Sequence, residues 1–224
     1  MYVTTDHNTL RVTKITLGAL ATNCYFIWDA KSREAVIIDP ADSGEFLIEV
    51  ANELALTPTA IVFTHAHFDH VLGAFALTAL LQIPTWLHPA DAPLLTTAQL
   101  SAHHWLGYPV DPVPPATHVL TENTTFKLGS EVLTVLHLPG HTPGSVGIGV
   151  FAGESPFICS GDLVTDEGHG STHHRYSNLV ALEHSLKKLS ELPTSTYYYP
   201  GHGNLLTQPD LKAMLAEYLA ASVQ

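Results

Sequence analysis

Cysteine and basic residues are scarce in this sequence. Cys24 and Cys159 are the only two cysteines, and both lie in apolar segments, so they are too few to staple the chain and are expected to be buried, reduced thiols. Nine basic residues stand against 21 acidic ones, giving a formal net charge of -12. That balance disfavours a nucleic-acid partner, because a phosphate backbone is bound through lysine and arginine.

Long apolar runs are also missing. No segment reaches the roughly 20 apolar residues of a membrane span, and the apolar stretch 15–28 is interrupted by Thr22 and Asn23, unlike an export signal. We therefore expect a cytoplasmic protein with no membrane partner. Apolar residues make up 46% of the chain and charged residues 13%, which is typical of a compact globular protein. A single domain covering residues 1–224 is expected.

Strand and helix patterns alternate along the chain. Short apolar or alternating runs predict strands at 10–17, 23–30, 34–40, 60–65, 125–128, 131–138, 145–151, 156–162 and 196–203. Helical spacing predicts helices at 43–56 with Ser43 as its cap, and at 69–82, 179–192 and 208–223. The proline-rich segment 106–120 predicts a surface loop near the active face. These elements favour an α/β (α+β) chain with two sheets, or one large sheet, covered by helices.

Four side chains with metal-binding chemistry follow the predicted strand 60–65 within six positions. They are His65, His67, Asp69 and His70 in the segment THAHFDH. If the strand continues through His65 and His67, their imidazoles share one side and can hold a single metal, while Asp69 and His70 fall on the turn and the next helix. A solvated loop is disfavoured, because packing gives no reason for this spacing at a strand end.

Three more ligand-type residues each follow another predicted strand: His141, Asp162 and His202. Five histidines and two aspartates make two nitrogen-rich ligand sets, suited to zinc, with iron or manganese as alternatives. We expect one metal on His65, His67 and His141, a second on Asp69, His70 and His202, and Asp162 as a bridge between them. Two bound divalent ions would attract an anionic or carbonyl-containing small-molecule substrate despite the acidic chain.

The motifs H-x-H-x-D-H, GHTPGS, SGD and PGHG, in this order, resemble the metallo-β-lactamase superfamily and most closely its hydroxyacylglutathione hydrolase (glyoxalase II)-like branch. The resemblance spans nearly the whole chain. It implies an αββα sandwich of two mixed sheets flanked by helices, with the metals at one edge. It also implies that the ligand positions of the family are all present, at His65, His67, Asp69, His70, His141, Asp162 and His202.

Within the superfamily, Asp162 separates this chain from the true metallo-β-lactamases, which lack the bridging aspartate. The resemblance implies a thioester hydrolase in which paired metals activate water, and Asp69 orients that water or helps to move its proton. A thioester suits such a site because a thiolate leaves without needing a strong acid.

The chain departs from its nearest branch in the segment after Asp162. Glyoxalase II-like enzymes usually carry a basic residue there that engages glutathione, but this chain has Ser171, and no helical carboxyl-terminal domain is expected after His202. Arg175 is a candidate substitute, and Tyr176 is a candidate substrate contact. Three histidines in the same segment could form an accessory metal site or a lid, or could lie in a solvated loop: His169, His173 and His174. Trp105 and Tyr108 either line a substrate pocket or are packing residues.

Three alternatives stay open at the level of sequence. A persulfide dioxygenase-like oxidoreductase would hold one iron on two histidines and one aspartate, with His65 or a neighbour, His141 and Asp162 as the match. Hydrolysis of a lactone or a β-lactam is the second alternative, as a main or side activity. A non-catalytic metal-binding module is the third, although it would be expected to have lost a ligand. The sequence does not predict the physiological substrate or the oligomeric state.

Overall fold

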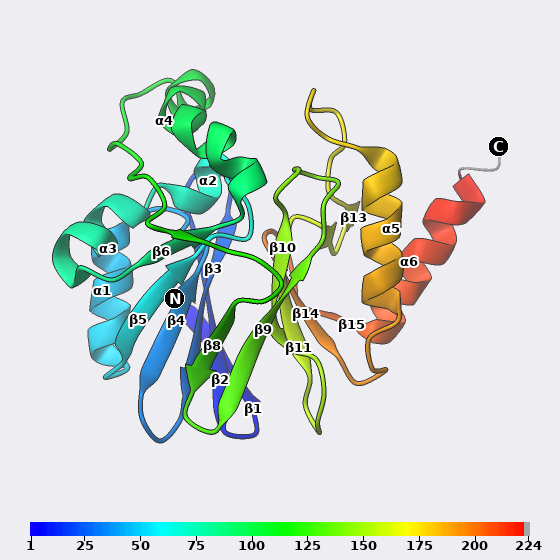
Figure 1. The fold of residues 1–224 in the computed structure, drawn as a ribbon, viewed down its shortest axis with the longest axis horizontal. Helices are drawn as coiled ribbons and strands as arrows, with labels where there is room; N and C mark the ends of the chain where they lie inside the picture. Colours follow the sequence, from blue (N-terminus) through cyan, green and yellow to red (C-terminus); the bar gives the residue numbers. More distant parts are fainter. Residues whose placement is uncertain (222–224) are drawn as a thin grey trace.

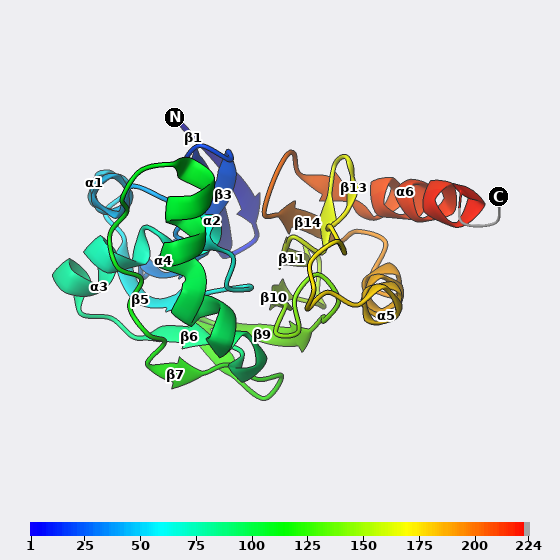
Figure 2. The same cartoon turned by 90° about the horizontal axis from the view of Figure 1, so that it is seen from above.

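The computed structural model describes the chain from residue 1 to residue 221. Two mixed β-sheets pack face to face, and helices cover the outer face of each (Figure 1). Seen from above, four helices gather over one sheet, and the two last helices lie on the opposite side (Figure 2). The predicted αββα sandwich is therefore confirmed.

The first sheet has seven strands in chain order, antiparallel from the first to the fourth and parallel from the fourth to the seventh. Its strands are β1 (Tyr2–His7), β2 (Leu10–Leu17), β3 (Thr22–Asp29), β4 (Glu34–Ile38), β5 (Thr57–Val62), β6 (Thr85–Leu87) and β7 (His118–Val119). Its outer helices are α1 (Gly44–Glu53), α2 (Phe68–Val71), α3 (Ala74–Leu81) and α4 (Ala92–Leu106).

The second sheet has six strands in the order β15-β14-β11-β10-β9-β8, and only β11 and β14 pair in parallel. Its strands are β8 (Thr125–Leu128), β9 (Glu131–His137), β10 (Val146–Val150), β11 (Phe157–Gly161), β14 (Tyr197–Pro200) and β15 (Leu206–Thr207). Its outer helices are α5 (Leu179–Ser190) and α6 (Gln208–Ala221). A small hairpin of β12 (Val164–Thr165) and β13 (Gly168–His169) follows β11.

Three apolar cores separate the four layers, and the alternation of side chains along each strand assigns residues to them. In β3, Cys24, Phe26 and Trp28 pack against the helices of the first sheet, whereas Tyr25 and Ile27 point into the core between the sheets. A third core joins the second sheet to α5 and α6. Its members include Ile158, Leu182, Leu186, Tyr198 and Leu211. Cys24 and Cys159 are both buried and free, as predicted.

Several predicted element bounds are wrong, and each difference has a local cause. The strand predicted at 60–65 ends at Val62, because the backbone N–H groups of Thr64 and Ala66 donate to buried carboxylates instead of a neighbouring strand. The helix predicted at 69–82 divides into α2 and α3 at Gly73, whose backbone packs so closely against Pro40 that no side chain fits.

Two further differences concern helices. Ser43 precedes α1, as predicted, but its side chain makes no capping hydrogen bond, and its φ of 53° places it in the left-handed region. No helix is predicted from the sequence at α4, because its apolar residues do not form a regular stripe and Leu100 and Trp105 are exposed. The helix predicted at 208–223 is α6, and residues 222–223 lie outside the described part.

The strand directions bring the ligand-type residues to one edge of the sandwich. β4 and β5 are parallel, and β9, β11 and β14 run in a common direction, so the loops that follow these strands open on the same side of their sheets. Of the described helices, none is both long and apolar enough to cross a membrane.

Candidate metal centre

The seven predicted ligand residues meet at this edge in two groups. The ligand atoms of the first group lie within 4.8 Å of one another, and they belong to His65, His67, His141 and Asp162. The second group meets the same criterion and consists of Asp69, His70 and His202. The sequence prediction divides the other six residues in the same way, with Asp162 as a bridge between the sets. The grouping arises even though His65 and His67 lie on a loop rather than on a continued strand.

Asp162 lies between the two groups. Its Oδ2 is 4.0 Å from Nε2 of His65 and 3.7 Å from Nε2 of His141, both in the first group. The same carboxylate reaches the second group, with Oδ1 3.4 Å from Nε2 of His70 and Oδ2 3.5 Å from Nε2 of His202. One carboxylate therefore faces both ligand sets, which is the placement that a bridging ligand requires.

Hydrogen bonds on the outer ring nitrogens fix how the imidazoles point. Nδ1 of His70 donates to Asp39 at 2.9 Å, Nδ1 of His141 to the Ser171 carbonyl at 2.8 Å, and Nδ1 of His202 to the Leu20 carbonyl at 3.1 Å. In the neutral form of each ring, this bond places the single proton on Nδ1, so that the lone pair of Nε2 is directed at the cluster.

The two remaining imidazoles, of His65 and His67, differ in which ring nitrogen faces the cluster. Nδ1 of His65 pairs with the Thr64 hydroxyl at 3.0 Å, which again leaves Nε2 for the cluster. His67 is turned the other way: its Nδ1 faces Nε2 of His141 at 3.0 Å, and its Nε2 lies 2.7 Å from the Tyr176 hydroxyl.

Three inward-facing atoms are buried and have no hydrogen bond within the described chain: Nε2 of His65, Nε2 of His70 and Oδ1 of Asp162. Buried polar atoms in native proteins almost always have a partner, and leaving one unpaired costs about 1–3 kcal/mol. A cation between the two groups would supply that partner to all three atoms. The donor set of imidazole nitrogens and carboxylate oxygens fits two divalent metals of the zinc, iron or manganese type.

Burial keeps the nitrogen-rich group neutral. It lowers the pKa of His65 well below its ordinary value, and the neighbouring imidazoles of His70 and His67 add to the effect. The pKa of His67 falls to about 3 for the same reasons, burial first and then His141. Burial also lowers the pKa of His141. Neutral imidazoles are the form that binds metal, so these side chains are ready to act as ligands at neutral pH.

The second group carries the opposite balance of charge. Burial opposes the charge on His70, but the carboxylates of Asp162, Asp69 and Asp39 together outweigh it and raise the pKa of His70 well above its ordinary value. Burial likewise opposes the charge on Asp69, but His70 and hydrogen bonds from His202 and Thr22 lower its pKa to about 2. This half of the site therefore concentrates negative charge around one protonated imidazole, and a cation would replace that proton.

Two supporting residues were not predicted from the sequence as parts of the site. Asp39 is buried, accepts hydrogen bonds from the backbone and hydroxyl of Thr64, and orients His70. Thr22 donates to Oδ2 of Asp69 at 2.7 Å. The Asp39-Pro40 pair was interpreted only as the end of a strand, although a carboxylate directly after an apolar run is the same signal that marks His65 and Asp162.

Asp91 joins two of the ligand-bearing loops, and it too was missed. Its fully buried carboxylate accepts from the backbone of Ala66 at 3.0 Å, from the hydroxyl of Thr142 at 2.8 Å and from the backbone of Gly144 at 2.6 Å. Ala66 separates His65 from His67, and Thr142 follows His141, so a single carboxylate holds three ligands in register.

We expect Asp91→Ala to lower the free energy of unfolding by about 3 to 5 kcal/mol, because three buried donors lose their acceptor. Urea unfolding followed by circular dichroism measures the change. Asp91→Asn keeps one acceptor oxygen and the side-chain volume, and a smaller loss is expected. An unchanged unfolding midpoint in Asp91→Ala would show that the carboxylate does not hold these loops.

Glycine is required where the backbone passes close to the cluster. A Cβ on Gly201 would collide with Oδ1 of Asp162 and lie 2.6 Å from Cε1 of His70, and a Cβ on Gly170 would collide with the backbone oxygen of Asp162. The backbone N–H of Gly201 also donates to the Gly161 carbonyl at 2.9 Å. The PGHG turn can therefore approach Asp162 only without a side chain at position 201.

The candidate substrate residues divide into those near the cluster and those outside it. Tyr176 contacts His67, and burial together with the charge of Asp91 raises the pKa of its hydroxyl to about 12, so the hydroxyl keeps its proton at neutral pH. Arg175 is exposed and makes no described contact with the seven ligand residues. Ser171 contributes its backbone carbonyl to His141 rather than a charged side chain.

The three histidines after Asp162 do not form a metal cluster within the described chain. His174 instead stacks on the Tyr176 ring, with centroids 5.2 Å apart, and lies 5.0 Å from the ring of His67. His169 bonds to the backbone of Gly170, and His173 is exposed. His174 is exposed but packs against Tyr176 and His67, and of the interpretations left open for these histidines the accessory metal site has no support in the described chain. Trp105 is 73% exposed.

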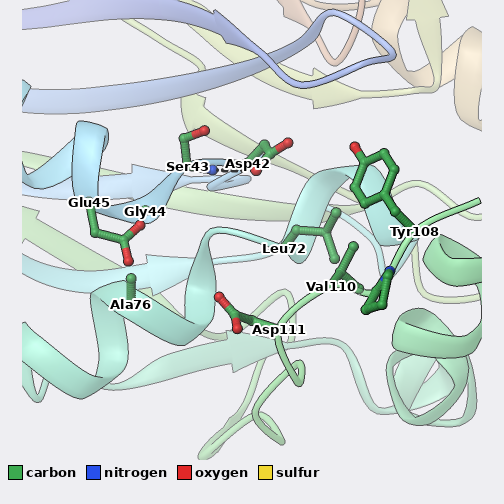
Figure 3. Close-up of a pocket in the computed structure, with 10 residues that line it drawn as sticks. Asp42, Ser43, Gly44, Glu45, Leu72, Ala76, Tyr108, Val110 and Asp111 are labelled. Atoms are coloured by element: carbon green, nitrogen blue, oxygen red, sulfur yellow. Dashed lines mark hydrogen bonds between the residues drawn. The ribbon is translucent and has the colours of Figure 1, made fainter. Parts of the chain in front are cut away.

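A cavity of about 430 Å³ lies between the start of α1, the α2–α3 junction and the loop after α4, and none of the seven predicted ligand residues lines it (Figure 3). Tyr108 and Val110 form one side of it. Its charged lining residues within the described chain are all acidic: Asp42, Glu45 and Asp111. Asp42 also lines a narrow crevice together with Asp69, and these two carboxylates disfavour an anionic group there.

Comparison with solved structures extends the likeness beyond the ligand residues. The protein TTHA1623, solved in a di-iron-bound form, superposes with a TM-score of 0.80 and 37% identity, covering 90% of this chain and 97% of that one. A B3 metallo-β-lactamase, BLEG-1, superposes with a TM-score of 0.78 and 33% identity, covering 88% and 94%.

Sequence comparison points the same way. The hydroxyacylglutathione hydrolase GloC of Haemophilus influenzae is 31% identical over 195 residues, which are 86% of this chain and 91% of GloC. The model of the metallo-β-lactamase superfamily matches residues 17–202, a range that includes all seven residues of the cluster. On this evidence the chain belongs to the metallo-β-lactamase superfamily.

Proposed function

We propose that the protein is a metal-dependent hydrolase of the glyoxalase II type that cleaves a thioester or a related ester. The observation that carries the proposal is the position of Asp162, which faces both ligand groups and so suits a binuclear centre. The ligand assignment is that of the sequence prediction: His65, His67, His141, Asp69, His70 and His202, with Asp162 shared. The likeness to GloC supports the thioester class.

Two bound divalent ions would supply a water of lowered pKa and positive charge at the scissile carbonyl. The chain's own contribution is to position the groups around that water. Asp69 is fixed by the Thr22 hydroxyl and lies 3.1 Å from Nε2 of His202, so its carboxylate can orient the attacking water and accept its proton. The thiolate leaves without a general acid, and none of the seven residues is needed for that role.

We propose zinc as the metal, because the first group consists of three imidazoles and one carboxylate, that of Asp162. Iron and manganese suit the same donors, and the di-iron form of TTHA1623 supports iron as the alternative. We place the protein in the cytoplasm, a proposal that its two free, buried cysteines support.

Recognition of a glutathione thioester would differ here in one respect from that of glyoxalase II-like enzymes. No basic side chain stands at position 171, so recognition of a glutathione carboxylate would fall to Arg175. Hydrolysis of a β-lactam is a second candidate, which the likeness to BLEG-1 supports.

Elemental analysis of the purified protein, beside a substrate panel, tests the proposal. We expect two equivalents of metal and faster cleavage of S-lactoylglutathione or a simple thioester than of a lactone or a cephalosporin. One equivalent of iron with oxygen uptake on a persulfide would replace the hydrolase by the dioxygenase alternative. A cephalosporin cleaved faster than every thioester would reassign the substrate class and leave the metal centre intact.

A further inference from the structure

Asn23 is a buried polar residue at the start of an otherwise largely apolar strand. All eight residues of β3 are buried, and the exposed fraction of Asn23 is 1%. Asparagine is depleted in strands, and a buried amide needs partners for two N–H groups and one carbonyl oxygen. The partners of Asn23 therefore indicate why the strand carries an amide at this position.

These partners lie in the PGHG turn of the second sheet, which carries His202. The side-chain Nδ2 of Asn23 donates to the Pro200 carbonyl and to the Gly203 carbonyl, each at 3.0 Å. The backbone N–H of Asn23 donates to the Gly201 carbonyl at 2.7 Å. One residue of the first sheet thus binds the carbonyl of every residue in the turn except that of His202.

The same partners determine how the amide of Asn23 is oriented. Carbonyl oxygens only accept hydrogen bonds, so Nδ2 faces the turn and Oδ1 faces away from it. Oδ1 accepts from the Thr16 hydroxyl at 2.8 Å, across the pair of β2 and β3. Both N–H groups and the oxygen of the side chain are therefore used. No other side chain of this size offers two donors and one acceptor in this arrangement.

The start of β3 also holds Asp69, which faces His202 in the second ligand group. Thr22, directly before Asn23, donates its hydroxyl to Oδ2 of Asp69 at 2.7 Å and forms an isolated antiparallel bridge with His202. The same Oδ2 lies 3.1 Å from Nε2 of His202. Residues 22 and 23 thus hold two of the three members of the second group, whereas Asp91 holds the loops of the first group.

We propose that Asn23 is a positioning residue for the second metal site: its hydrogen bonds to the turn fix the position of His202 relative to Asp69, and so set the metal affinity of that site. This inference rests on the binuclear centre of the proposed function. Within the described chain, no hydrogen bond joins Asn23 to a member of the first ligand group. Loss of the amide therefore acts on one of the two sites.

Asn23→Asp tests this role, because it keeps the shape of the side chain and replaces the two N–H donors by an oxygen that faces carbonyl oxygens. We expect the affinity for the second zinc ion to fall by about 10- to 100-fold, as is typical when a residue that orients a ligand is lost, and the affinity for the first to stay within about threefold. The added negative charge by itself favours a cation, so charge does not explain a loss.

Two further variants accompany it. Thr16 is exposed, so Thr16→Val removes the hydrogen bond to Oδ1 of Asn23 without disturbing the core, and we expect a loss of about 3- to 10-fold at the second site only. Trp28→Phe is the control for stability. It removes a buried hydrogen bond of 2.9 Å to the Thr13 hydroxyl, between the same two strands at the other end of β3, and both zinc affinities are expected to equal those of the wild type.

Native mass spectrometry during a zinc titration counts the zero-, one- and two-zinc species, and NMR of protein with ¹⁵N-labelled histidine identifies the imidazoles that bind zinc. We expect Asn23→Asp to populate a one-zinc species in which the histidines of the first group bind the ion and His202 does not. A one-zinc species held by His202 overturns the proposal.

Three other results also overturn it: an equal loss of affinity at both sites, two zinc ions bound as tightly as in the wild type, or a wild type that binds only one. If Asn23→Asp does not fold, wild-type affinities in Thr16→Val overturn the proposal as well. None of these measurements needs a substrate. A wild type that binds two zinc ions and cleaves no thioester therefore contradicts the proposed function and not the role of Asn23.

Discussion

Asp162→Ala is expected to abolish paired metal binding and to lower thioester turnover by more than about 10³-fold, because both the attacking water and the positive charge at the carbonyl depend on the pair. The carboxylate of Asp162 faces both groups: Oδ1 lies 3.4 Å from Nε2 of His70, and Oδ2 lies 3.7 Å from Nε2 of His141. Without the Asp162 carboxylate, each metal site lacks one ligand, and no negative charge remains at that position to offset the repulsion between the two cations. Metal content after dialysis and kcat under saturating zinc measure the two effects together.

Two variants make this result specific. Asp162→Asn keeps the shape of the side chain without its charge, and we expect it to bind less metal and to lose most activity. Asp166→Asn changes a carboxylate four residues further on that bonds to Asn204 and lies outside both groups, so activity within about twofold of the wild type is expected. Two bound metals and full turnover in Asp162→Ala would refute the bridging assignment.

The residues that meet in the two groups could be predicted from the sequence because the loops that carry them each follow an apolar run. His65, Asp162 and His202 stand after β5, β11 and β14, and a polar residue in that position has no packing role. Strand order then brings the members together, and strand order follows from a resemblance that includes nearly the whole chain. The predicted grouping does not depend on the exact ends of the strands. The strand β5 ends at Val62 instead of residue 65, and the two groups still form.

The residues that orient the ligands could not be predicted in the same way. Asp91 is in contact with Ala66 and Thr142, 25 and 51 positions away, and nothing in its own segment indicates either partner. Thr22 reaches Asp69 across 47 positions. These hydrogen bonds depend on the relative position of loops that are distant in the sequence, and the local sequence of each loop does not indicate that position. Tyr176 was only a general candidate for substrate contact, because its position behind His67 depends on the path of the loop 170–178.

Removal of the metals is expected to lower the melting temperature by roughly 15 to 30 °C. At a free metal concentration a thousandfold above the dissociation constant, each site adds about 4 kcal/mol to the free energy of unfolding, so two sites add about 8. A domain of this size gains about 2 to 4 °C for each kcal/mol. Without the metals, Nε2 of His65, Nε2 of His70 and Oδ1 of Asp162 are buried with no hydrogen bond in the described chain, so nothing there replaces the lost interactions.

Calorimetry of the zinc-loaded protein with and without chelator, at fixed protein concentration, measures this shift. Asp162→Ala serves as the control for effects of the chelator that do not involve the metal centre. We expect this variant to have a low melting temperature that the chelator changes little. Zinc added back in excess should restore the wild type and not the variant. A melting temperature that chelation leaves within about 2 °C would mean that metal binds loosely or elsewhere, since linkage requires any ligand held tightly by the folded state alone to stabilise that state. The size of the shift therefore tests, without any substrate, whether these seven side chains form a tight metal centre.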